Sequence, residues 1–371
     1  MNLTLEKFAS VTVTANTTWV FAVLSDGEGN STTAEIGSRQ VAEALKGMAS
    51  VLSDEEVSDE SELEALLGLT SDALRRDQTS GTAVSGLRTA VAQLCAMRSG
   101  VSLGEYLGAK ATEKVQLYAN INRSLFATDR TPADFGRMAE RAASAGFRVF
   151  KCAPFDEVSP PSSPDRILDE AGAGLARVRA VREAVGVDAT VLVDCHSRFE
   201  RDTAPLVVEE LAKLNVGWFE EPVQPTSDPE DLAAIARWAP MPVAGGESGY
   251  GVDFFDSILD SNAVSIVMPD VKYCGGAAEA VTIGRSTGAK GKGFSMHSPS
   301  GPVSLLASGH ATAAVPNSMP LEHAVYETDW RADLLTPRER VEDGHLYLTD
   351  TLGLGAELAW DLVERFGRVW D

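Results

Sequence analysis

The strongest constraint in the sequence is a repeat that begins beyond residue 112. A short apolar run is followed by a polar junction and a helical stretch, and then the next apolar run begins. Eight runs follow one another, at 115–121, 147–153, 190–194, 216–220, 241–247, 263–270, 293–297 and 318–323. Strands that alternate with helices pair in parallel, and eight of them can close into a barrel. We therefore predict an α/β fold, with a parallel barrel over residues 112–323.

The two ends of the chain have a different pattern. Residues 10–24 are rich in Val and Thr and run into a turn cluster at 26–30, which predicts a β-hairpin. Residues 38–107 have helical periodicity, so residues 1–111 should form an α+β unit. The stretch 341–361 is typical of a hairpin with a tail, and we expect the segment 324–371 to return to the N-terminal unit.

Composition excludes several classes of protein. Apolar residues make up 44% and charged residues 23% of the chain, which is ordinary globular composition. The net charge of −22 would repel nucleic acid and anionic lipid, so neither partner is expected. Apolar runs fall short of the ~20 residues of a membrane span. Glu6 and Lys7 interrupt any leader-like segment, and the four cysteines lie far apart, so we expect a cytoplasmic protein without disulfides.

Ionisable residues end six of the apolar runs, and they are spaced 26, 27, 23, 27 and 25 residues apart. They are Asp194, Glu220, Glu247, Asp270, His297 and Glu322. In a parallel barrel all strand C-termini point to one face, where active sites are built. A single acid after a strand is commonly a helix cap, but capping does not explain six residues in register with the repeat. The sequence therefore predicts that these groups converge.

Three carboxylates at consecutive strand ends indicate a metal site. Asp194, Glu220 and Glu247 would repel one another and raise one another's pKa unless a cation neutralised them. An all-oxygen set that needs neither Cys nor His favours Mg²⁺ over Zn²⁺.

The next groups are candidates for proton transfer. Asp270 and His297 end neighbouring strands, so the carboxylate can orient the imidazole. His196 lies two residues after Asp194 and, on a continuing strand, would share its face. The alternative is that His196 only hydrogen-bonds a metal ligand. Lys151 should point into the barrel, as a catalytic cation or as a simple ion-pair partner of the carboxylates.

These residues lie in motifs that resemble the enolase superfamily, in particular its mandelate racemase-like subgroup. The motifs are VDCHSRF around Asp194, WFEEPV around Glu220, AGGES around Glu247, MPDVKYCGG around Asp270 and FSMHSPSGP around His297. The resemblance implies an N-terminal capping domain, a modified (β/α)₇β barrel and a C-terminal segment that rejoins the cap. It also implies Mg²⁺ on Asp194, Glu220 (rather than Glu221) and Glu247, with a substrate carboxylate on that metal.

The resemblance further implies the chemistry: the proton α to the substrate carboxylate is abstracted, with His297 as the base. Lys151 and Glu322 would stabilise the negative charge that develops, and Glu322 can donate a hydrogen bond only if its pKa is raised. The chain departs from the Lys-x-Lys pattern of the family, because Lys151 is followed by Cys152 and Ala153. A second base is therefore missing. Asp194-x-His196 instead resembles sugar-acid dehydratases, in which that histidine protonates the departing β-hydroxyl.

We therefore expect an Mg²⁺-dependent lyase that converts a polyhydroxy (sugar) acid into a 2-keto-3-deoxy acid. The alternatives are a racemase, epimerase or cycloisomerase, with Lys151 as the second base, and a non-catalytic metal-binding barrel. The expected partners are a small-molecule carboxylate substrate and further copies of the chain. Substrate contacts should come from the loop 14–19, including Trp19, and from Asn122 and Arg123, although 120–123 could equally be a helix-capping turn.

Overall fold

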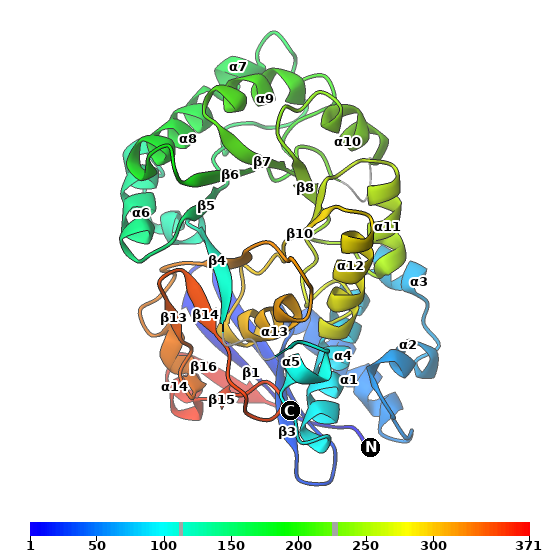
Figure 1. Ribbon diagram of the computed structural model, residues 1–371. Helices are drawn as coiled ribbons and strands as arrows, with labels where there is room; N and C mark the ends of the chain where they lie inside the picture. Colours follow the sequence, from blue (N-terminus) through cyan, green and yellow to red (C-terminus); the bar gives the residue numbers. More distant parts are fainter. Residues whose placement is uncertain (111–113, 225–228) are drawn as a thin grey trace.

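The computed structural model describes residues 1–110, 114–224 and 229–371, which form a barrel with a second α+β unit packed below it in the view of Figure 1. Both chain termini lie in that second unit, which we call the cap. The predicted boundary between residues 111 and 112 falls outside the described residues.

The barrel has eight parallel strands. They are β4 (Lys114–Asn120), β5 (Val149–Cys152), β6 (Thr190–Asp194), β7 (Val216–Glu220), β8 (Val243–Gly245), β9 (Ile266–Val267), β10 (Gly293–Phe294) and β11 (Leu321–Ala324). Each strand pairs with the next as far as β10, and β11 pairs with β4. Bonds from Met319 N to Phe294 O (2.8 Å) and from Glu322 N to Met296 O (3.2 Å) link β10 to β11 and close the ring.

Seven main helices connect these strands. They are α6 (Pro132–Ser144), α8 (Gly172–Val185), α9 (Ala204–Lys213), α10 (Pro229–Ala236), α11 (Val252–Asp260), α12 (Ala277–Ala289) and α13 (Pro302–Ala313). The last strand, β11, is followed by a short 3₁₀ turn at Arg331–Leu334 instead of a helix. The predicted modified (β/α)₇β barrel is therefore confirmed.

A layer of large side chains fills the barrel interior below the site. It consists of Tyr118, Leu192, Trp218, Ala244, Ile266 and Met268. Because alternate residues of a strand share a face, the residues two positions beyond Tyr118, Leu192, Trp218 and Met268 also face the interior. Those residues are Asn120, Asp194, Glu220 and Asp270. The polar groups thus lie directly above the apolar layer, towards the C-terminal ends of the strands.

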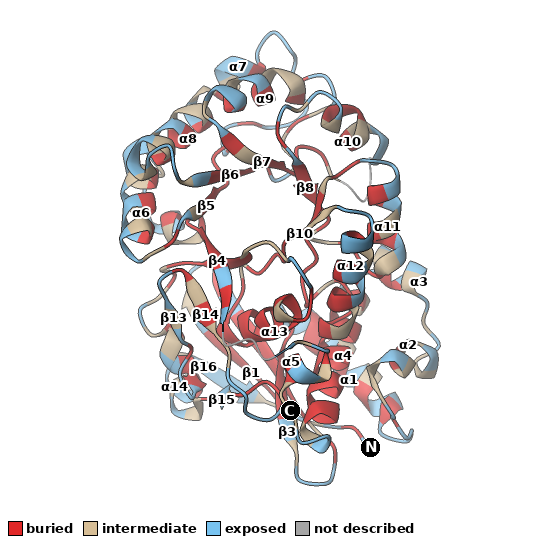
Figure 2. Cartoon of the chain, viewed as in Figure 1, coloured by how far each residue is buried: buried red, intermediate tan, exposed pale blue. Residues whose placement is uncertain are grey.

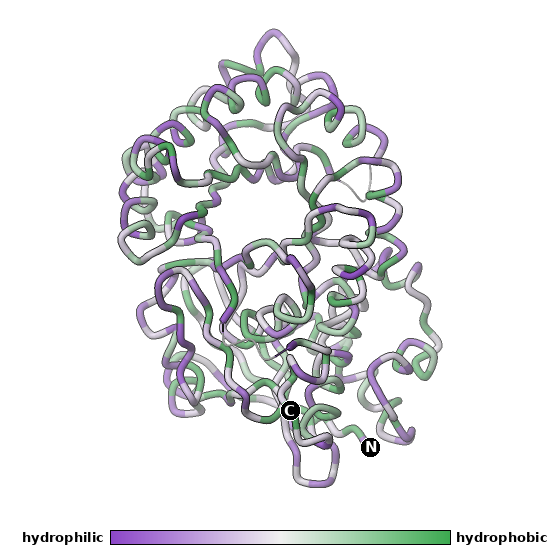
Figure 3. Tube along the Cα trace, viewed as in Figure 1, coloured by the Kyte–Doolittle hydropathy of each residue, from purple (hydrophilic) through white to green (hydrophobic). Residues whose placement is uncertain are grey.

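Burial and hydropathy follow the same plan. Figure 2 shows buried residues on the barrel strands and on the inner faces of the surrounding helices, whose outer faces are exposed. Figure 3 shows hydrophobic and hydrophilic positions alternating along these helices, as expected for amphipathic helices on a barrel. Among the described residues, no helix is long and apolar enough to cross a membrane. The cytoplasmic location and the homo-oligomer stay predictions.

The cap is built on an antiparallel sheet in the order β16–β1–β2–β3. Its N-terminal strands are β1 (Thr4–Thr14), β2 (Thr17–Ser25) and β3 (Ser31–Glu35). The predicted hairpin with its turn at 26–30 is present, because β2 pairs antiparallel with β3. The stretch 10–24 is not one strand, however, since a further turn at 15–16 divides it between β1 and β2. No Gly or Pro marks that turn, so the composition of the stretch does not reveal it.

Helices of the cap cover one face of this sheet. The long ones are α1 (Arg39–Leu52) and α4 (Gln78–Arg98), with α2 (Leu63–Leu66), α3 (Ser71–Arg76) and α5 (Leu103–Tyr106) between and after them. The strands and helices of the cap share a hydrophobic core distinct from the barrel's.

The C-terminal segment returns to the cap only in part. β13 (Val341–Glu342) and β14 (His345–Tyr347) form the predicted hairpin, but β14 pairs antiparallel with β4, at the start of the barrel strand. The chain then adds β15 (Glu357–Leu358), paired with β12 (Leu335–Thr336), and α14 (Trp360–Phe366). Only the final strand, β16 (Gly367–Trp370), joins the cap sheet, beside β1.

Buried polar contacts fix the cap against the barrel. Glu35 of β3 accepts hydrogen bonds from Gly301 N (2.7 Å) and Ser304 N (3.1 Å), at the start of α13. A carboxylate at a helix N-terminus is favoured by both the unpaired N–H groups and the helix dipole. Arg88 of α4 pairs with Glu279 of α12 at 3.1 Å. These contacts tie the cap to the two helices that follow β9 and β10.

His310 makes the stability of this assembly sensitive to acid. Its Nδ1 accepts from Gly104 N (3.2 Å), its Nε2 lies 3.1 Å from Leu354 O, and burial lowers its pKa from 6.5 to about 4. The unfolded chain therefore binds the proton more readily, and stability falls as the pH drops from 6.5 towards 4. We expect this group to lower the free energy of unfolding by about 2 kcal/mol between pH 7 and pH 5.

Urea unfolding of the wild type and of His310→Asn at both pH values checks this expectation. Other titrating groups contribute equally to both proteins, so the variant should lose about 2 kcal/mol less over this pH step. An equal loss in the two proteins would contradict the assignment.

Candidate active site

A cavity of about 440 Å³ lies at the C-terminal ends of the barrel strands, under residues of the cap. Most of the predicted site residues line it, and only three do not. The lining residues among them are Asn122, Arg123, Lys151, Asp194, His196, Glu247, His297 and Glu322. Two of the remaining three, Glu220 and Asp270, lie directly behind Lys151 and His297 and contact them. The structure therefore brings together the groups that the strand-end pattern predicted.

The three predicted metal ligands form one cluster. Asp194, Glu220 and Glu247 each offer a carboxylate oxygen, and these oxygens lie within 4.8 Å of one another. Asp194 and Glu220 are register partners on neighbouring strands and are buried, whereas the side chain of Glu247 is 27% exposed towards the cavity. Burial and the surrounding carboxylates raise the pKa of Glu220 well above its usual range. An oxygen-only cluster with excess negative charge fits a hard divalent cation.

Lys151 stands beside this cluster on β5. Its Nζ lies 2.7 Å from Glu220 Oε1, 2.9 Å from Glu322 Oε1 and 3.9 Å from Asp194 Oδ2. Burial alone would lower the pKa of Lys151, but these carboxylates raise it, so the ammonium is charged. The next residue, Cys152, points into the outer core, and Ala153 offers no titratable group. The chain thus has a single lysine at the end of this strand.

His297 and Asp270 make the predicted pair. Nδ1 of His297 lies 2.9 Å from Asp270 Oδ2, and its Nε2 lies 3.1 Å from Glu247 Oε2. Burial alone would lower the pKa of His297, but the charges of Glu247 and Glu322 and the contact with Asp270 raise it to about 9. The ring is therefore held at one nitrogen by Asp270, with the other nitrogen directed towards the acidic cluster.

Glu322 corrects one expectation. Burial tends to raise the pKa of Glu322, but Lys151 and His297 outweigh it and lower the pKa. Both carboxylate oxygens accept hydrogen bonds, Oε1 from Asn120 Nδ2 (2.7 Å) and Oε2 from Ser298 N (3.0 Å). The predicted raised pKa is wrong in this arrangement, because the ammonium of Lys151 stabilises the ionised form. Glu322 is an acceptor that holds its neighbours, not a donor.

His196 lines the cavity, but not in the way expected. The strand β6 ends at Asp194, and His196 has a left-handed backbone (φ 48°), so the expected continuation of the strand is wrong. Asp194 causes the bend, since its Oδ1 accepts from His196 N at 2.9 Å. Nε2 of His196 lies 3.0 Å from Asp194 Oδ2, and its side chain is 48% exposed. The imidazole therefore reaches the rim of the cavity beside a metal-ligand candidate.

Trp19 is the predicted residue that the structure removes from the site. It lies on β2, is 3% exposed and packs edge-on against Trp330 (6.0 Å between ring centroids). The turn at 15–16 explains the error, because it places Trp19 inside a strand and Asn16 at the cavity. Arg123 and Asn122 do line the cavity, and Arg123 Nη1 reaches Thr17 Oγ1 at 3.5 Å.

Several cavity residues are absent from the sequence prediction. Asn120 ends β4, so the strand-end rule applied to the first run would have included it. Lys272 follows Asp270 by two residues, is 8% exposed and also lines the cavity. Gln78 comes from the start of α4 in the cap, and no sequence signal relates it to the barrel.

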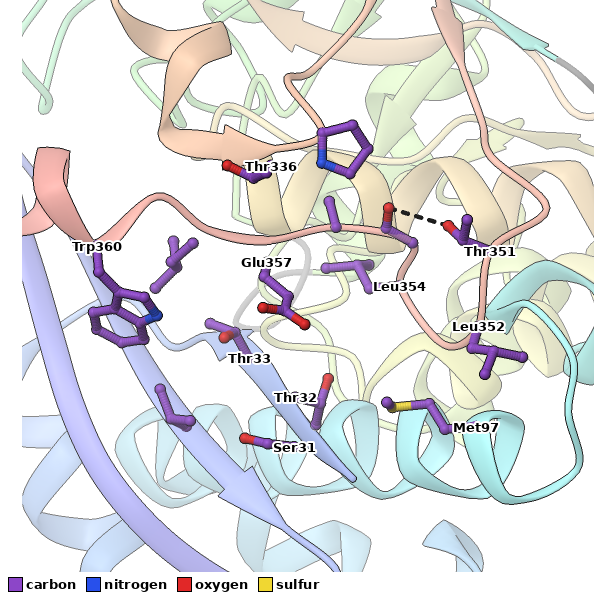
Figure 4. A pocket seen from close by; sticks show the side chains of 15 residues that line it. Ser31, Thr32, Thr33, Met97, Thr336, Thr351, Leu352, Leu354, Glu357 and Trp360 are labelled. Atoms are coloured by element: carbon purple, nitrogen blue, oxygen red, sulfur yellow. Dashed lines mark hydrogen bonds between the residues drawn. The ribbon is translucent and has the colours of Figure 1, made fainter. Parts of the chain in front are cut away.

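A second cavity of about 440 Å³, shown in Figure 4, lies between the cap and the C-terminal segment. Among the described residues that line it, Glu357 is the one ionisable side chain. The others include Ser31, Thr33, Met97 and Trp360. It holds no group of residues suited to proton transfer or metal binding, so the chemistry belongs to the cavity at the barrel strand ends.

Known proteins match this chain over most of its length. The family described as "Enolase C-terminal domain-like" matches residues 134–362. D-xylonate dehydratase of Haloferax volcanii is 28% identical over 285 residues, covering 76% of this chain and 69% of that protein. D-galactarolactone cycloisomerase of Agrobacterium fabrum is 30% identical over 324 residues, covering 83% and 80%.

A solved structure has the same fold. The mandelate racemase/muconate lactonizing enzyme-like protein of Rubrobacter xylanophilus superposes with a TM-score of 0.85 at 26% identity, covering 99% of this chain and 98% of that one. The match extends over the cap as well as the barrel, so the overall fold is shared.

Proposed function

Because the chain belongs to the enolase superfamily, we propose that it is a hydro-lyase of the acid-sugar dehydratase type, which forms a 2-keto-3-deoxy acid. The observation that carries the proposal is the convergence of His297 and His196 on one cavity with the acidic cluster. β-Elimination of water needs one base and one acid, and these two imidazoles supply that pair.

Asp194, Glu220 and Glu247 would hold a divalent cation, and an all-oxygen donor set favours Mg²⁺. When bound, Mg²⁺ would supply positive charge at the substrate carboxylate, where negative charge develops. In this structure a basic side chain lies against each ligand: Lys151 at Glu220, His196 at Asp194 and His297 at Glu247. That arrangement supports a site which requires positive charge.

The protein's own groups divide the remaining work. His297 takes the α proton of the substrate at Nε2, while Asp270 holds Nδ1 and stabilises the cation that results. Lys151 keeps its positive charge beside the developing oxyanion, and Glu322 holds Lys151 and Asn120 in place. His196, at the rim, donates a proton to the departing β-hydroxyl.

A cycloisomerase is the second candidate, since one relative carries that name. A racemase or epimerase needs proton transfer on both faces of the substrate carbon. The residues after Lys151, Cys152 and Ala153, provide no second base there, and Lys151 is held as an ammonium between carboxylates. These contacts favour dehydration, which needs only the His297 and His196 pair.

Incubation of the purified enzyme and Mg²⁺ with a panel of aldonates, aldarates and their lactones tests the proposal. Semicarbazone absorbance would report 2-keto-3-deoxy acid, and the product's mass would lie 18 Da, one water, below that of the substrate acid. Consumption of lactone without loss of water would identify a cycloisomerase. Binding of Mg²⁺ with neither product formation nor α-proton exchange would indicate a non-catalytic barrel.

A further inference from the structure

The cavity is also lined by two basic residues that the mechanism above does not use. Lys272 lies in the loop between β9 and α12, and Arg123 lies just after β4; both line the cavity. Burial and the Arg123 charge work to lower the pKa of Lys272, although Tyr273, Asp270 and Glu35 raise it overall. Both cations line the same cavity.

Lys272 has donors without acceptors. Its side chain is 10% exposed, and the nearest carboxylate oxygen, Asp270 Oδ2, is 4.0 Å from Nζ, beyond hydrogen-bond distance. Within the described part of the chain, no acceptor lies within bonding distance of this Nζ. An ammonium has three N–H donors, and this one lines the cavity, where a ligand can reach it. A ligand in the cavity would provide the missing acceptors.

The neighbouring carboxylates are already engaged. Asp270 uses Oδ2 for His297 and Oδ1 for the backbone N–H of Lys272 (2.8 Å). Glu35 accepts from the N–H groups at the start of α13. The charges of Asp270 and Glu35 balance the charge of Lys272, but neither carboxylate accepts a hydrogen bond from its Nζ.

Arg123 is also incompletely used. Its Nη1 is 3.5 Å from Thr17 Oγ1 and 3.8 Å from Glu327 Oε1, and its side chain is 31% exposed. A guanidinium has five N–H donors in a planar fork that matches a carboxylate or a phosphate. Asn16 and Asn122 line the same cavity and add neutral polar groups.

We propose that the cavity is specific for acid sugars with a second anionic group, a distal carboxylate or phosphate, which Lys272 and Arg123 bind. The inference rests on the dehydratase function proposed above and narrows its substrate class to dianions. The reacting carboxylate would lie at the acidic cluster, and the second anion would complete the unused donors of Lys272 and Arg123.

Matched substrate pairs test the proposal directly. Galactarate and galactonate, and glucarate and gluconate, differ only in whether C6 is a carboxylate or a hydroxymethyl group; 6-phosphogluconate supplies the phosphate form. Binding is measured by calorimetry with the His297→Asn enzyme and Mg²⁺, so that no turnover interferes, and kcat/KM is measured with the wild type. We expect at least one dianion to bind about tenfold or more tightly than its monoanionic match.

Variants locate the preference. Lys272→Met and, independently, Arg123→Gln should each reduce the dianion-to-monoanion ratio of kcat/KM about tenfold. Lys292→Met removes the same charge from a partly exposed lysine that contacts Asn262 Oδ1 (3.3 Å), and it should keep the ratio of the wild type. Thermal unfolding of all three variants separates lost binding from lost folding, and Arg123→Gln keeps the test open if Lys272→Met does not fold.

The outcomes separate this inference from the proposed function. Equal affinity for both members of every pair, or no binding of any dianion, overturns the inference. Equal dehydration of the diacid and the monoacid also overturns the inference, but it leaves the proposed dehydratase function intact. Tighter binding of a dianion without any keto acid from the wild type supports the inference and shows that the proposed reaction is wrong.

Discussion

Replacing His297 by Asn is expected to lower both keto-acid formation and the exchange of the α proton with solvent by orders of magnitude, whereas replacing His196 by Asn is expected to lower only keto-acid formation. The expectation follows from their positions. His297 is held at Nδ1 by Asp270 with Nε2 directed towards the acidic cluster, and His196 lies at the rim of the cavity. Losing either proton-transfer group should cost about 10²- to 10⁴-fold in keto-acid formation.

The measurement is proton NMR of substrate recovered from deuterated water. The His196→Asn enzyme should wash deuterium into the α position, because His297, Lys151 and the acidic cluster remain. If deuterium exchange survived in His297→Asn and were lost in His196→Asn, then His196 would be the base and His297 the acid. Wild-type keto-acid formation by both variants would remove both histidines from the mechanism.

Replacing Glu247 by Gln is expected to reduce Mg²⁺ affinity and to lower kcat/KM by about a thousandfold. Removing one of three carboxylates weakens a site that needs charge as well as oxygen ligands, and metal-ion stabilisation of a developing oxyanion is commonly worth several kcal/mol. Glu247 is the least buried of the three ligands, so its substitution disturbs folding least. Calorimetric titration with Mg²⁺ measures the affinity directly.

Glu221→Gln is the matched control for this metal prediction. Glu221 is buried next to Glu220, but its Oε1 accepts from Gly246 N (2.7 Å) and Glu247 N (3.3 Å), and a glutamine can accept the same bonds. Its Mg²⁺ affinity should remain within a few-fold of the wild type. Wild-type affinity in Glu247→Gln, or a large loss in Glu221→Gln, would show that the ligands have been assigned incorrectly.

The parts of the site that could be predicted are those fixed by local periodicity. An apolar run of a few residues defines a strand, and the residue at its C-terminal end lies at one rim of the barrel. Because the run repeats around the barrel, the end residues of all the strands meet at that rim. Asp194 and Glu220 are direct register partners for that reason. Strand alternation likewise placed Lys151 inside the barrel.

The parts that could not be predicted depend on contacts between distant elements. The lowered pKa of Glu322 comes from Lys151, on a strand at the other end of the barrel sequence. The pKa of Lys272 is raised in part by the charge of Glu35, which comes from the cap. Trp19 was misplaced because an unmarked turn shifts the loop to Ala15 and Asn16.

The hydrogen bonds that Glu35 accepts from the start of α13 also affect how substrate enters and product leaves. If the cap swung away as a rigid body, these bonds would break, and each polar group left unpaired would cost about 1–3 kcal/mol. The movement would also pull on α13, which begins just after His297. The turn carrying Asn16 is held by a short-range bond, from Asn16 N to Thr14 Oγ1 (3.2 Å) at the surface. We therefore expect substrate and product to pass the cavity mouth by motion of this loop, which loops make on nanosecond to microsecond timescales, and without a hinge motion of the whole cap.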